Sequence, residues 1–511
     1  MRTFKFTLPT EDLYRSGLRL LYSARHLLFG LMAVLLGVVV GRGLASPGSY
    51  QDVITYLVFG GWLVLCLLDP LTGLLAIILV NPFIETSIKL DLGKGIPDFS
   101  ITRFGAAFLL TFLLARTAVR LHRLASPTRV EAAMLAAVAG MSAAVDASVN
   151  PTAALQRILT LYMVPYSLYF LTKNLVQDRS HLDRFLFALI IVGAYSGLYA
   201  AYEQLTGNIL FTTADLKGRI LYYGTEKIRV LRGLYGEPAT FGRVFGMIIP
   251  INFYMMLEAP GRRRRFILLG TLGVSFLGLL LAYNRTPWIT TLLGFVILQF
   301  VYPKFRRLFL ALILVAGTLA FFSSDRLEES TFSERINSNS TLEGRTLRWE
   351  TAFNMWKDKP LGGWGFDRYQ YESGKYRPDG LRQNIRAVES TFMAILVATG
   401  LLGFVPWVTV LVLLLYLSIR LYIQARTPGW PGFVEDKLFA IFWAVFITYA
   451  LGAWTVVVNH PMVHILFFTI AGALVGTHQH LMDADAETRR STLQGGRAGS
   501  PARGSVNAPT L

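Results

Sequence analysis

Long apolar stretches recur along this chain, and they constrain its fold more than any other feature of the sequence. A helix needs roughly 20 predominantly apolar residues to cross about 30 Å of hydrocarbon. Of the 511 residues, 53% are hydrophobic and 16% are charged, a composition far from that of an ordinary soluble enzyme. We therefore expect an all-α polytopic integral membrane protein with about 12–14 transmembrane helices.

Fourteen stretches are candidate spans. Twelve spans are also compatible with the sequence, because several stretches are short and residues 68–71 barely separate two of them. The fold class is the same in either case. The candidates are residues 27–41, 53–68, 71–84, 104–115, 132–145, 155–171, 185–201, 241–257, 266–282, 288–301, 308–322, 391–419, 438–458 and 462–477.

The basic residues predict how the chain is oriented. Short cytoplasmic loops are enriched in Lys and Arg, and a membrane setting explains the net charge of +17 better than nucleic-acid binding does. Residues 1–26 lack a cleavage site for a signal peptide, so we expect the first span to be retained. We expect one cytoplasmic side to carry the N-terminus, residues 116–129, 173–184, 262–265 and 304–307, and the tail.

This topology divides the chain into segments. The tail is rich in Gly, Ser, Pro, Ala and Arg and cannot bury a core. The expected segments are a cytoplasmic N-terminus (residues 1–26), an N-terminal transmembrane bundle (27–201), a periplasmic loop (202–240), transmembrane helices (241–322), a large periplasmic loop (323–388), C-terminal transmembrane helices (389–480) and a disordered cytoplasmic tail (481–511).

The sequence also excludes several kinds of site. Cys66 is the only cysteine, so there is no internal disulfide, zinc cluster built on cysteines or CxxC redox site. No P-loop, GxGxxG or HExxH motif is present.

The sequence predicts one helix within the large loop. Ser340 and Glu343 have the spacing of a capping box, and the Pro-Leu-Gly-Gly sequence at 360–363 stops the helix. Such a helix either lies at the outer membrane interface with its aromatic residues inward or packs on the bundle. Arg345 flanks the apolar face and Arg348 lies further round, directed at an anionic headgroup or at water. That face comprises Leu342, Thr346, Trp349, Phe353 and Trp356.

Several short motifs then occur in order within this polytopic chain. Gly-Arg at 344–345 and Trp349 precede Pro-Leu-Gly-Gly-Trp-Gly at 360–365, and Glu389-Ser390 precedes Gly-Leu-Leu-Gly at 400–403 by nine residues. Asn-Arg-Thr at 284–286 and Arg-Gly-Leu-Tyr-Gly-Glu-Pro at 232–238 come earlier. In these motifs the sequence resembles the bacterial O-antigen ligase and polysaccharide polymerase superfamily. Glu389 stands where the family motif has a histidine.

The resemblance implies a GT-C-like glycosyltransferase that needs no nucleotide, metal or other cofactor. The implied donor is a glycan on undecaprenyl diphosphate, and the acceptor is lipid A-core in ligases or a second lipid-linked glycan in polymerases. The implied setting is the periplasmic face of the inner membrane, with a flippase and a chain-length regulator as possible partners. Polymerases of the family often have an acidic residue in place of the histidine, which favours a polymerase; a ligase remains the alternative.

The same resemblance assigns candidate roles to individual residues. Arginines would stabilise the charge that builds on the departing lipid diphosphate. Arg285 is the only basic residue in the short predicted outward turns, although an arginine there can also snorkel to the interface. Arg232 and Arg243 have comparable alternatives in solvent or at the interface. The candidate diphosphate ligands are Arg285, Arg232, Arg243, Arg345 and Arg348, with Glu237 orienting one of them.

Glu389 is the candidate general base, because a carboxylate at hydrogen-bonding distance can take the proton of the attacking hydroxyl. An acid also suits a helix N-terminus without any catalytic role. Ser390 is the candidate helix cap, Gly400 and Gly403 permit close helix packing, and His460 and His464 are alternative bases.

A transporter or flippase is the alternative from another functional class. Such carriers place charged or broken-helix sites near the bilayer midplane and often contain inverted repeats. The sequence has few charges within its spans and no visible repeat. Its charges gather at one predicted membrane face, which favours transfer chemistry.

Overall fold

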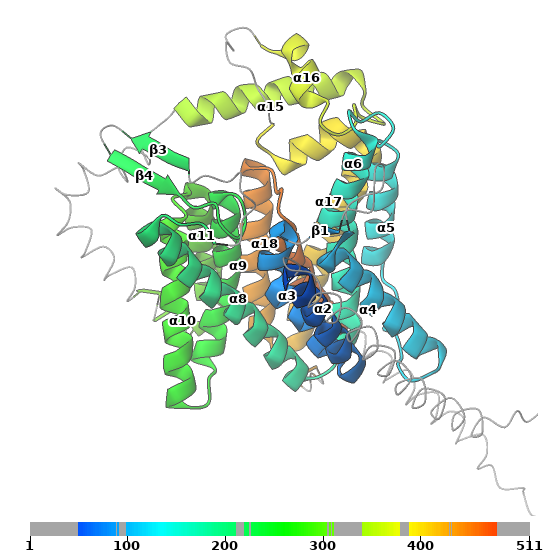
Figure 1. Ribbon diagram of the computed structural model, residues 1–511. Coiled ribbons are helices and arrows are strands. Elements are labelled where there is room, and N and C mark those ends of the chain that lie inside the picture. Colours follow the sequence, from blue (N-terminus) through cyan, green and yellow to red (C-terminus); the bar gives the residue numbers. More distant parts are fainter. Residues whose placement is uncertain are drawn as a thin grey trace, which may run out of the picture.

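The computed structural model describes residues 50–87, 89–90, 99–210, 219–223, 226–303, 306–307, 309–310, 340–378, 388–428, 430 and 432–477. Helices dominate this part of the chain and form a bundle, with one long helix lying across its top in Figure 1. Among the described residues, five helices are long and apolar enough to cross a membrane, and four further apolar helices are shorter. The predicted class, a helical multi-pass membrane protein, is confirmed; two small two-stranded sheets accompany the helices.

The helices coincide with the predicted spans to within a few residues. Spans 27–41 and 308–322 lie wholly or almost wholly outside the described residues, as do the two terminal segments. The five long helices are α8 (Arg179–Thr206), α9 (Pro238–Leu257), α10 (Arg262–Leu281), α17 (Thr391–Ala425) and α18 (Asp436–Thr455). The others are α2 (Tyr50–Leu68), α3 (Pro70–Ser87), α4 (Ile101–Ala118), α5 (Arg129–Ser142), α6 (Pro151–Ile158), α7 (Val164–Leu175), α11 (Arg285–Val301) and the C-terminal helix Pro461–Thr477.

Polar caps and prolines set where several helices begin. Thr128 and Glu131 form a capping box at the start of α5, and the Asp178 side chain accepts a hydrogen bond from the backbone N–H of His181 at the start of α8 (2.8 Å). Pro238 occupies the first position of α9, where the missing N–H costs nothing.

One predicted span is not a continuous α-helix. A π-helical turn, η1 (Leu159–Met163), separates α6 from α7. Pro165 follows this turn, and a proline both lacks an N–H and clashes with the carbonyl four residues earlier. The widened turn accommodates the proline without ending the helical path.

The helices have two distinct ends. α9 is buried along nearly its whole length and packs against α8, α10, α11 and α18. We call the end at which α9 and α17 begin the α15 end, after the helix α15 (Ser340–Asp358) that lies there. The opposite end is where α8 and α18 begin, and there Arg179 of α8 pairs with Glu435 beside α18 at 3.2 Å. The basic segments 173–184 and 262–265 belong to this opposite end.

α15 (Ser340–Asp358) lies across the α15 end of the bundle (Figure 1). It ends before Pro360, where the sequence predicts, whereas the residues ahead of Ser340 lie outside those described. Its buried residues are Thr351, Ala352 and Met355, whereas Phe353 is 42% exposed. Of the predicted face, Trp349 contacts the Trp454 ring and Trp356 packs beside Met355, so the inward side overlaps the predicted face only in part. A small apolar cluster joins Ala352 and Met355 to Tyr369, Val388 and Val397.

Short elements complete the fold. Beside α15 lie α16 (Tyr369–Glu372) and the 3₁₀ turn η2 (Ser373–Tyr376). Two antiparallel hairpins were not predicted: β1 (Lys89–Leu90) with β2 (Phe99–Ser100), and β3 (Arg219–Tyr223) with β4 (Glu226–Val230), the latter within the long loop before α9.

Candidate functional site

The clearest polar cluster joins α15 to the residue that precedes α17. The Glu389 carboxylate forms ion pairs with Arg348 and with Arg345, whose Nε lies 3.5 Å from Glu389 Oε2. The three side chains are 35%, 25% and 23% exposed, so the cluster remains open to a ligand. Two candidate diphosphate ligands and the candidate base are thus brought together.

Local backbone geometry places Glu389 in this cluster. Ser390 is the N-cap of α17, with an extended backbone, and its Oγ accepts a hydrogen bond from Met393 N at 3.4 Å. Glu389 itself has a left-handed φ of 54°. A residue other than glycine rarely adopts this conformation, and such positions gather at functional sites.

The two glycine motifs of the sequence contact each other at a break in α17. Gly400 has φ 58° and ψ −159°, which breaks α17, and it therefore does not serve the helix packing predicted for it. A Cβ on Gly400 would lie 2.3 Å from the Leu361 carbonyl oxygen, and one on Gly363 would lie 2.5 Å from the Ala398 carbonyl. Only glycines allow the two backbones to approach this closely.

Four backbone hydrogen bonds join the segments across the break in α17. The loop accepts two bonds from α17 and donates two to it, so that the polar groups freed by the break are satisfied. The bonds are Trp364 N to Val397 O (2.8 Å), Gly365 N to Ala398 O (2.8 Å), Leu401 N to Pro360 O (2.8 Å) and Leu402 N to Leu361 O (3.1 Å). Gly403, one turn on, lies where α17 meets Gly140 of α5.

Arg243 enters the same end of the bundle from α9. Its side chain is buried, and Nη2 donates to Val456 O at 3.1 Å. Among the described residues its Nη1 has no hydrogen-bond partner. Thr391, the first residue of α17, also bonds to the Val456–Val458 segment: its Oγ1 accepts from Val458 N at 2.9 Å.

Arg232 and Glu237 lie in the segment just before α9. The buried Glu203 of α8 accepts hydrogen bonds from the backbone N–H groups of Arg232 (2.8 Å) and Gly233 (3.1 Å), which fixes the path of this segment. The Glu237 carboxylate accepts a hydrogen bond from the Thr240 hydroxyl at 2.9 Å. The sequence analysis missed Glu203, because nothing in the sequence distinguishes it from other polar residues near helix ends.

Arg285 is the first residue of α11 and is partly buried at the α15 end. The preceding Asn284 caps the helix by accepting from Thr286 N at 3.1 Å. The short predicted turn between α10 and α11 is therefore present, with its arginine at the α15 end.

The two alternative bases are buried. His460 Nδ1 accepts from Met462 N at 3.2 Å, and burial lowers the pKa of His460 to about 3, so its imidazole is neutral at physiological pH. His464 bonds through Nδ1 to the Tyr449 hydroxyl at 2.8 Å. Within the described part of the chain, no three His, Cys, Asp or Glu side chains group as metal ligands.

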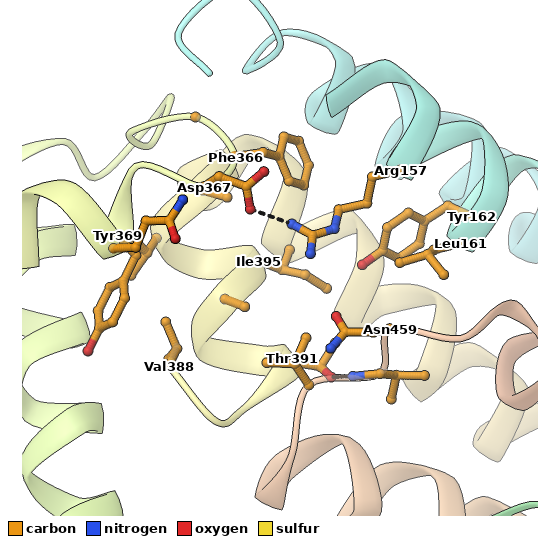
Figure 2. Close-up of a pocket in the computed structure, with 17 residues that line it drawn as sticks. Arg157, Leu161, Tyr162, Phe366, Asp367, Tyr369, Val388, Thr391, Ile395 and Asn459 are labelled. Carbon is orange, nitrogen blue, oxygen red and sulfur yellow. Dashed lines mark hydrogen bonds and ion pairs between the residues drawn. The ribbon is translucent and has the colours of Figure 1, made fainter. Parts of the chain in front are cut away.

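A pocket of about 180 Å³ lies beside the Glu389 segment (Figure 2). It brings Arg157 of α6 against Asp367, with Arg157 Nη1 3.0 Å from Asp367 Oδ1. Val388 and Thr391, on either side of Glu389 and Ser390, belong to its lining. Sequence analysis missed both charged residues. Asp367 lies two residues after the tryptophan–glycine motif, whereas nothing in the sequence distinguishes Arg157.

Apolar helices, with a polar cluster and an adjoining pocket gathered at one end, define the class: a multi-pass membrane protein with a site at one face of its bundle. A protein-family model described as O-antigen ligase matches residues 270–408, and this confirms the predicted resemblance to the O-antigen ligase-related superfamily. The match includes Arg285, Arg345, Arg348 and Glu389, whereas Arg232 and Arg243 precede it. No curated protein matches the chain.

Proposed function

We propose that this chain is a glycosyltransferase of the bacterial inner membrane that polymerises glycan. In this proposal it transfers an oligosaccharide from undecaprenyl diphosphate onto a growing O-antigen or exopolysaccharide chain at the periplasmic face, through a GT-C-like architecture without a metal. The observation that carries it is the cluster of Glu389 with Arg345 and Arg348, built from the motifs within the family match.

The proposed reaction is a displacement at the anomeric carbon of the donor. An acceptor hydroxyl attacks, the bond from that carbon to the diphosphate oxygen breaks, and the lipid diphosphate leaves with the electron pair. Arginines stabilise the charge on this leaving group, because a planar guanidinium matches phosphate oxygens with paired hydrogen bonds. The hydroxyl proton passes to the Glu389 carboxylate.

The contacts of Glu389 suggest how the donor engages the site. Its carboxylate contacts two guanidinium groups of α15. A diphosphate competes for the same N–H donors, of which each guanidinium has five. Donor binding would thereby free the carboxylate for the acceptor hydroxyl.

Polymerase is favoured over ligase because Glu389 takes the place of the histidine that ligases keep. The test uses the purified full chain in lipid nanodiscs with undecaprenyl diphosphate-linked repeat units. A polymerase makes a ladder of longer lipid-linked glycans from this donor alone, whereas a ligase makes product only when lipid A-core is added. If the donor instead crosses the membrane of proteoliposomes and no new glycosidic bond forms, the chain is a transporter, and the polymerase and ligase functions are both refuted.

Glu389→Gln tests the catalytic assignment within the same assay. If the carboxylate takes the proton, single-turnover transfer should fall ~10²–10⁴-fold, while the donor should bind at least as tightly as to wild type because the competing charge is gone. Glu389→His should restore part of the rate, because an imidazole can also accept the proton. Glu350→Gln, at an exposed position of α15, is the matched control and should behave as wild type. A wild-type rate for Glu389→Gln would refute the catalytic role. Glu389 would then act only on stability, through its charge at the N-terminus of α17, by about 1 kcal/mol at most.

A further inference from the structure

The pocket beside Glu389 has no role in the scheme above. It lies between the α6–η1 region, the residues after the Trp-Gly motif, the first turns of α17 and the connection from α18 to the C-terminal helix (Figure 2). Its volume of about 180 Å³ exceeds the share of a single water, roughly 30 Å³. It is smaller than the roughly 300–1,000 Å³ of pockets that hold drug-sized ligands. One small ring therefore suits it better than a chain of several rings.

The charged pair in the pocket has unused hydrogen-bonding capacity. Arg157 and Asp367 meet at 3.0 Å, yet their side chains are 37% and 45% exposed. A guanidinium carries five N–H donors and a carboxylate accepts about four hydrogen bonds, so each group can also bind a ligand. Because the two charges already compensate each other, the pair suits a neutral polyhydroxyl compound better than an anion.

Asp367 is held in position by its neighbours. It has a left-handed φ of 63°, a conformation that persists where the surroundings enforce it. On one side, Phe366 N donates to Ser148 Oγ at 2.8 Å, and on the other, Arg368 Nε donates to Ala147 O at 3.0 Å. These bonds hold the backbone on both sides of Asp367, from which its carboxylate reaches Arg157.

The remaining walls combine buried rings with a few polar groups, the usual character of a small-molecule site. Tyr162 and Phe366 are buried and line the pocket, and the exposed Asn459 contributes an amide at the rim. A pyranose presents both an apolar ring face and hydroxyl groups, which such walls can recognise together.

The pocket is also connected to the reaction centre. The Tyr369 hydroxyl donates to the backbone carbonyl of Arg348 at 3.2 Å, and Arg348 binds Glu389. Burial raises the pKa of Tyr369 above its usual value, so the hydroxyl remains a donor. The candidate diphosphate arginines are absent from the pocket lining.

We infer that this pocket binds a sugar ring of the acceptor glycan, with Asp367, Arg157 and Asn459 bonding its hydroxyl groups. The inference rests on the proposed function and adds the acceptor subsite to it. In this arrangement the arginines around Glu389 bind the diphosphate, and the pocket binds the sugar.

Two binding probes test the inference without requiring turnover. One is the lipid-free repeat-unit oligosaccharide released from the producing cell's own polysaccharide, and the other is undecaprenyl diphosphate without sugar. Both are titrated against the full chain in nanodiscs. Asp367→Asn and Arg157→Gln should weaken oligosaccharide binding at least tenfold and leave undecaprenyl diphosphate binding within twofold of wild type.

Two further variants keep the test decisive. Asn459→Ala changes only an exposed rim residue, so it should fold normally and still weaken oligosaccharide binding severalfold. Glu372→Gln breaks another ion pair of the same loop, Lys375–Glu372 at 2.7 Å, outside the pocket, and should change neither affinity. Unchanged oligosaccharide binding in the pocket variants, or loss of undecaprenyl diphosphate binding instead, would overturn the inference. A wild-type chain that binds both probes but never transfers glycan would count against the proposed function alone.

Discussion

Ion pairs at partly exposed positions add little to folding, and this determines how substitutions around Glu389 should be interpreted. Glu389, Arg345 and Arg348 each keep between 23% and 35% of their side chains exposed. Solvent screening leaves such pairs worth about 0–1 kcal/mol. Changes at these residues should therefore alter substrate handling far more than stability.

At the residue scale, the first prediction concerns Arg285 at the start of α11. If it binds the donor diphosphate, Arg285→Ala should lower the transfer rate about 10²–10³-fold, the range for a lost electrostatic donor. Arg285→Lys should be nearly as impaired, because a point charge cannot reproduce the paired hydrogen bonds of a guanidinium. Arg263→Ala, exposed at the opposite end, is the control for transfer in nanodiscs. Normal product from purified Arg285→Ala would refute the assignment.

The second prediction concerns pH and His460. Burial lowers its pKa from 6.5 to about 3, so the unfolded chain binds a proton between these values and the folded chain does not. Stability present above pH 6.5 should be lost as the pH falls toward 3, by about 2 kcal/mol between pH 7 and pH 5. His460→Gln removes this contribution, and its melting temperature in detergent should fall less over the same interval. Equal decreases in both proteins would contradict the prediction.

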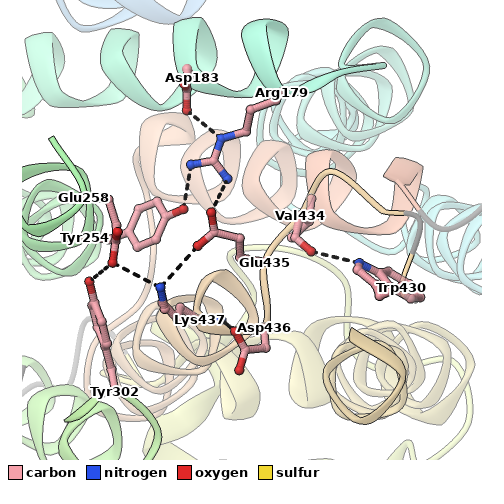
Figure 3. Close-up of polar contacts among 10 residues, drawn as sticks. All are labelled: Arg179, Asp183, Tyr254, Glu258, Tyr302, Trp430, Val434, Glu435, Asp436 and Lys437. Atoms are coloured by element: carbon pink, nitrogen blue, oxygen red, sulfur yellow. Dashed lines mark hydrogen bonds and ion pairs between the residues drawn. The ribbon is translucent and has the colours of Figure 1, made fainter. Parts of the chain in front are cut away.

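At the scale of elements, the two ends of the bundle are held by different means. The α15 end relies on backbone bonds between a loop and the break in α17. The opposite end relies on side chains: Lys437 lies 3.1 Å from Glu258, which also accepts from the Tyr302 hydroxyl, and Glu435 joins Lys437 to Arg179 (Figure 3). Together these contacts fasten α8, α9, α18 and the end of α11 to one another.

The third prediction tests the backbone contact. Gly400 occupies a region of φ and ψ that is essentially restricted to glycine. Gly400→Ala adds strain of roughly 1–3 kcal/mol and a Cβ clash with the Leu361 carbonyl, so both the melting temperature and the transfer rate should fall.

The matched control is Gly344→Ala in α15. A Cβ there meets nothing within 4 Å, and alanine favours a helix over glycine by up to about 1 kcal/mol. Its melting temperature should stay equal or rise. If Gly400→Ala also kept the wild-type melting temperature and rate, the contact between the motifs would have no importance for the site.

The elements show which features a single sequence can predict. Apolar length predicted the spans, and the stop signal at Pro360 predicted where α15 ends. The break in α17 could not be predicted, because Gly-Leu-Leu-Gly within an apolar run is compatible with a continuous helix and its loop partner is remote in sequence. The pairing of Glu389 with Arg345 and Arg348 could not be predicted for the same reason, since only the fold brings these distant motifs together. The roles of these residues remain predictions.

At the scale of the whole molecule, a run of exposed arginines and the candidate site lie at opposite ends of the bundle. Arg262–Arg265 are exposed at the start of α10, at the end opposite α15. Cytoplasmic loops attract such residues. This arrangement agrees with a cytoplasmic opposite end and a periplasmic α15 end.

The fourth prediction is the corresponding topology. Alkaline phosphatase inserted after Lys375, beside α15, should be active, because the enzyme matures only in the periplasm. The same insertion after Arg264 should be inactive. Colonies scored for phosphatase activity, with protein amounts checked by blotting, settle the matter. Activity only at Arg264 would reverse the orientation of the whole chain.

The break in α17 has a consequence for how the protein is made. Gly400 lies nine residues into the helix, about 14 Å along its axis. Backbone groups left unbonded at such a depth cost several kcal/mol each in lipid. The loop that bonds them precedes α17 in the chain. If the α15 end is periplasmic, as predicted, the loop crosses the membrane first, and α17 reaches its final position only once the loop is there to bond it. The loop and α17 would then have to be inserted together. A chain in which the loop failed to reach α17 would be a substrate for membrane proteases.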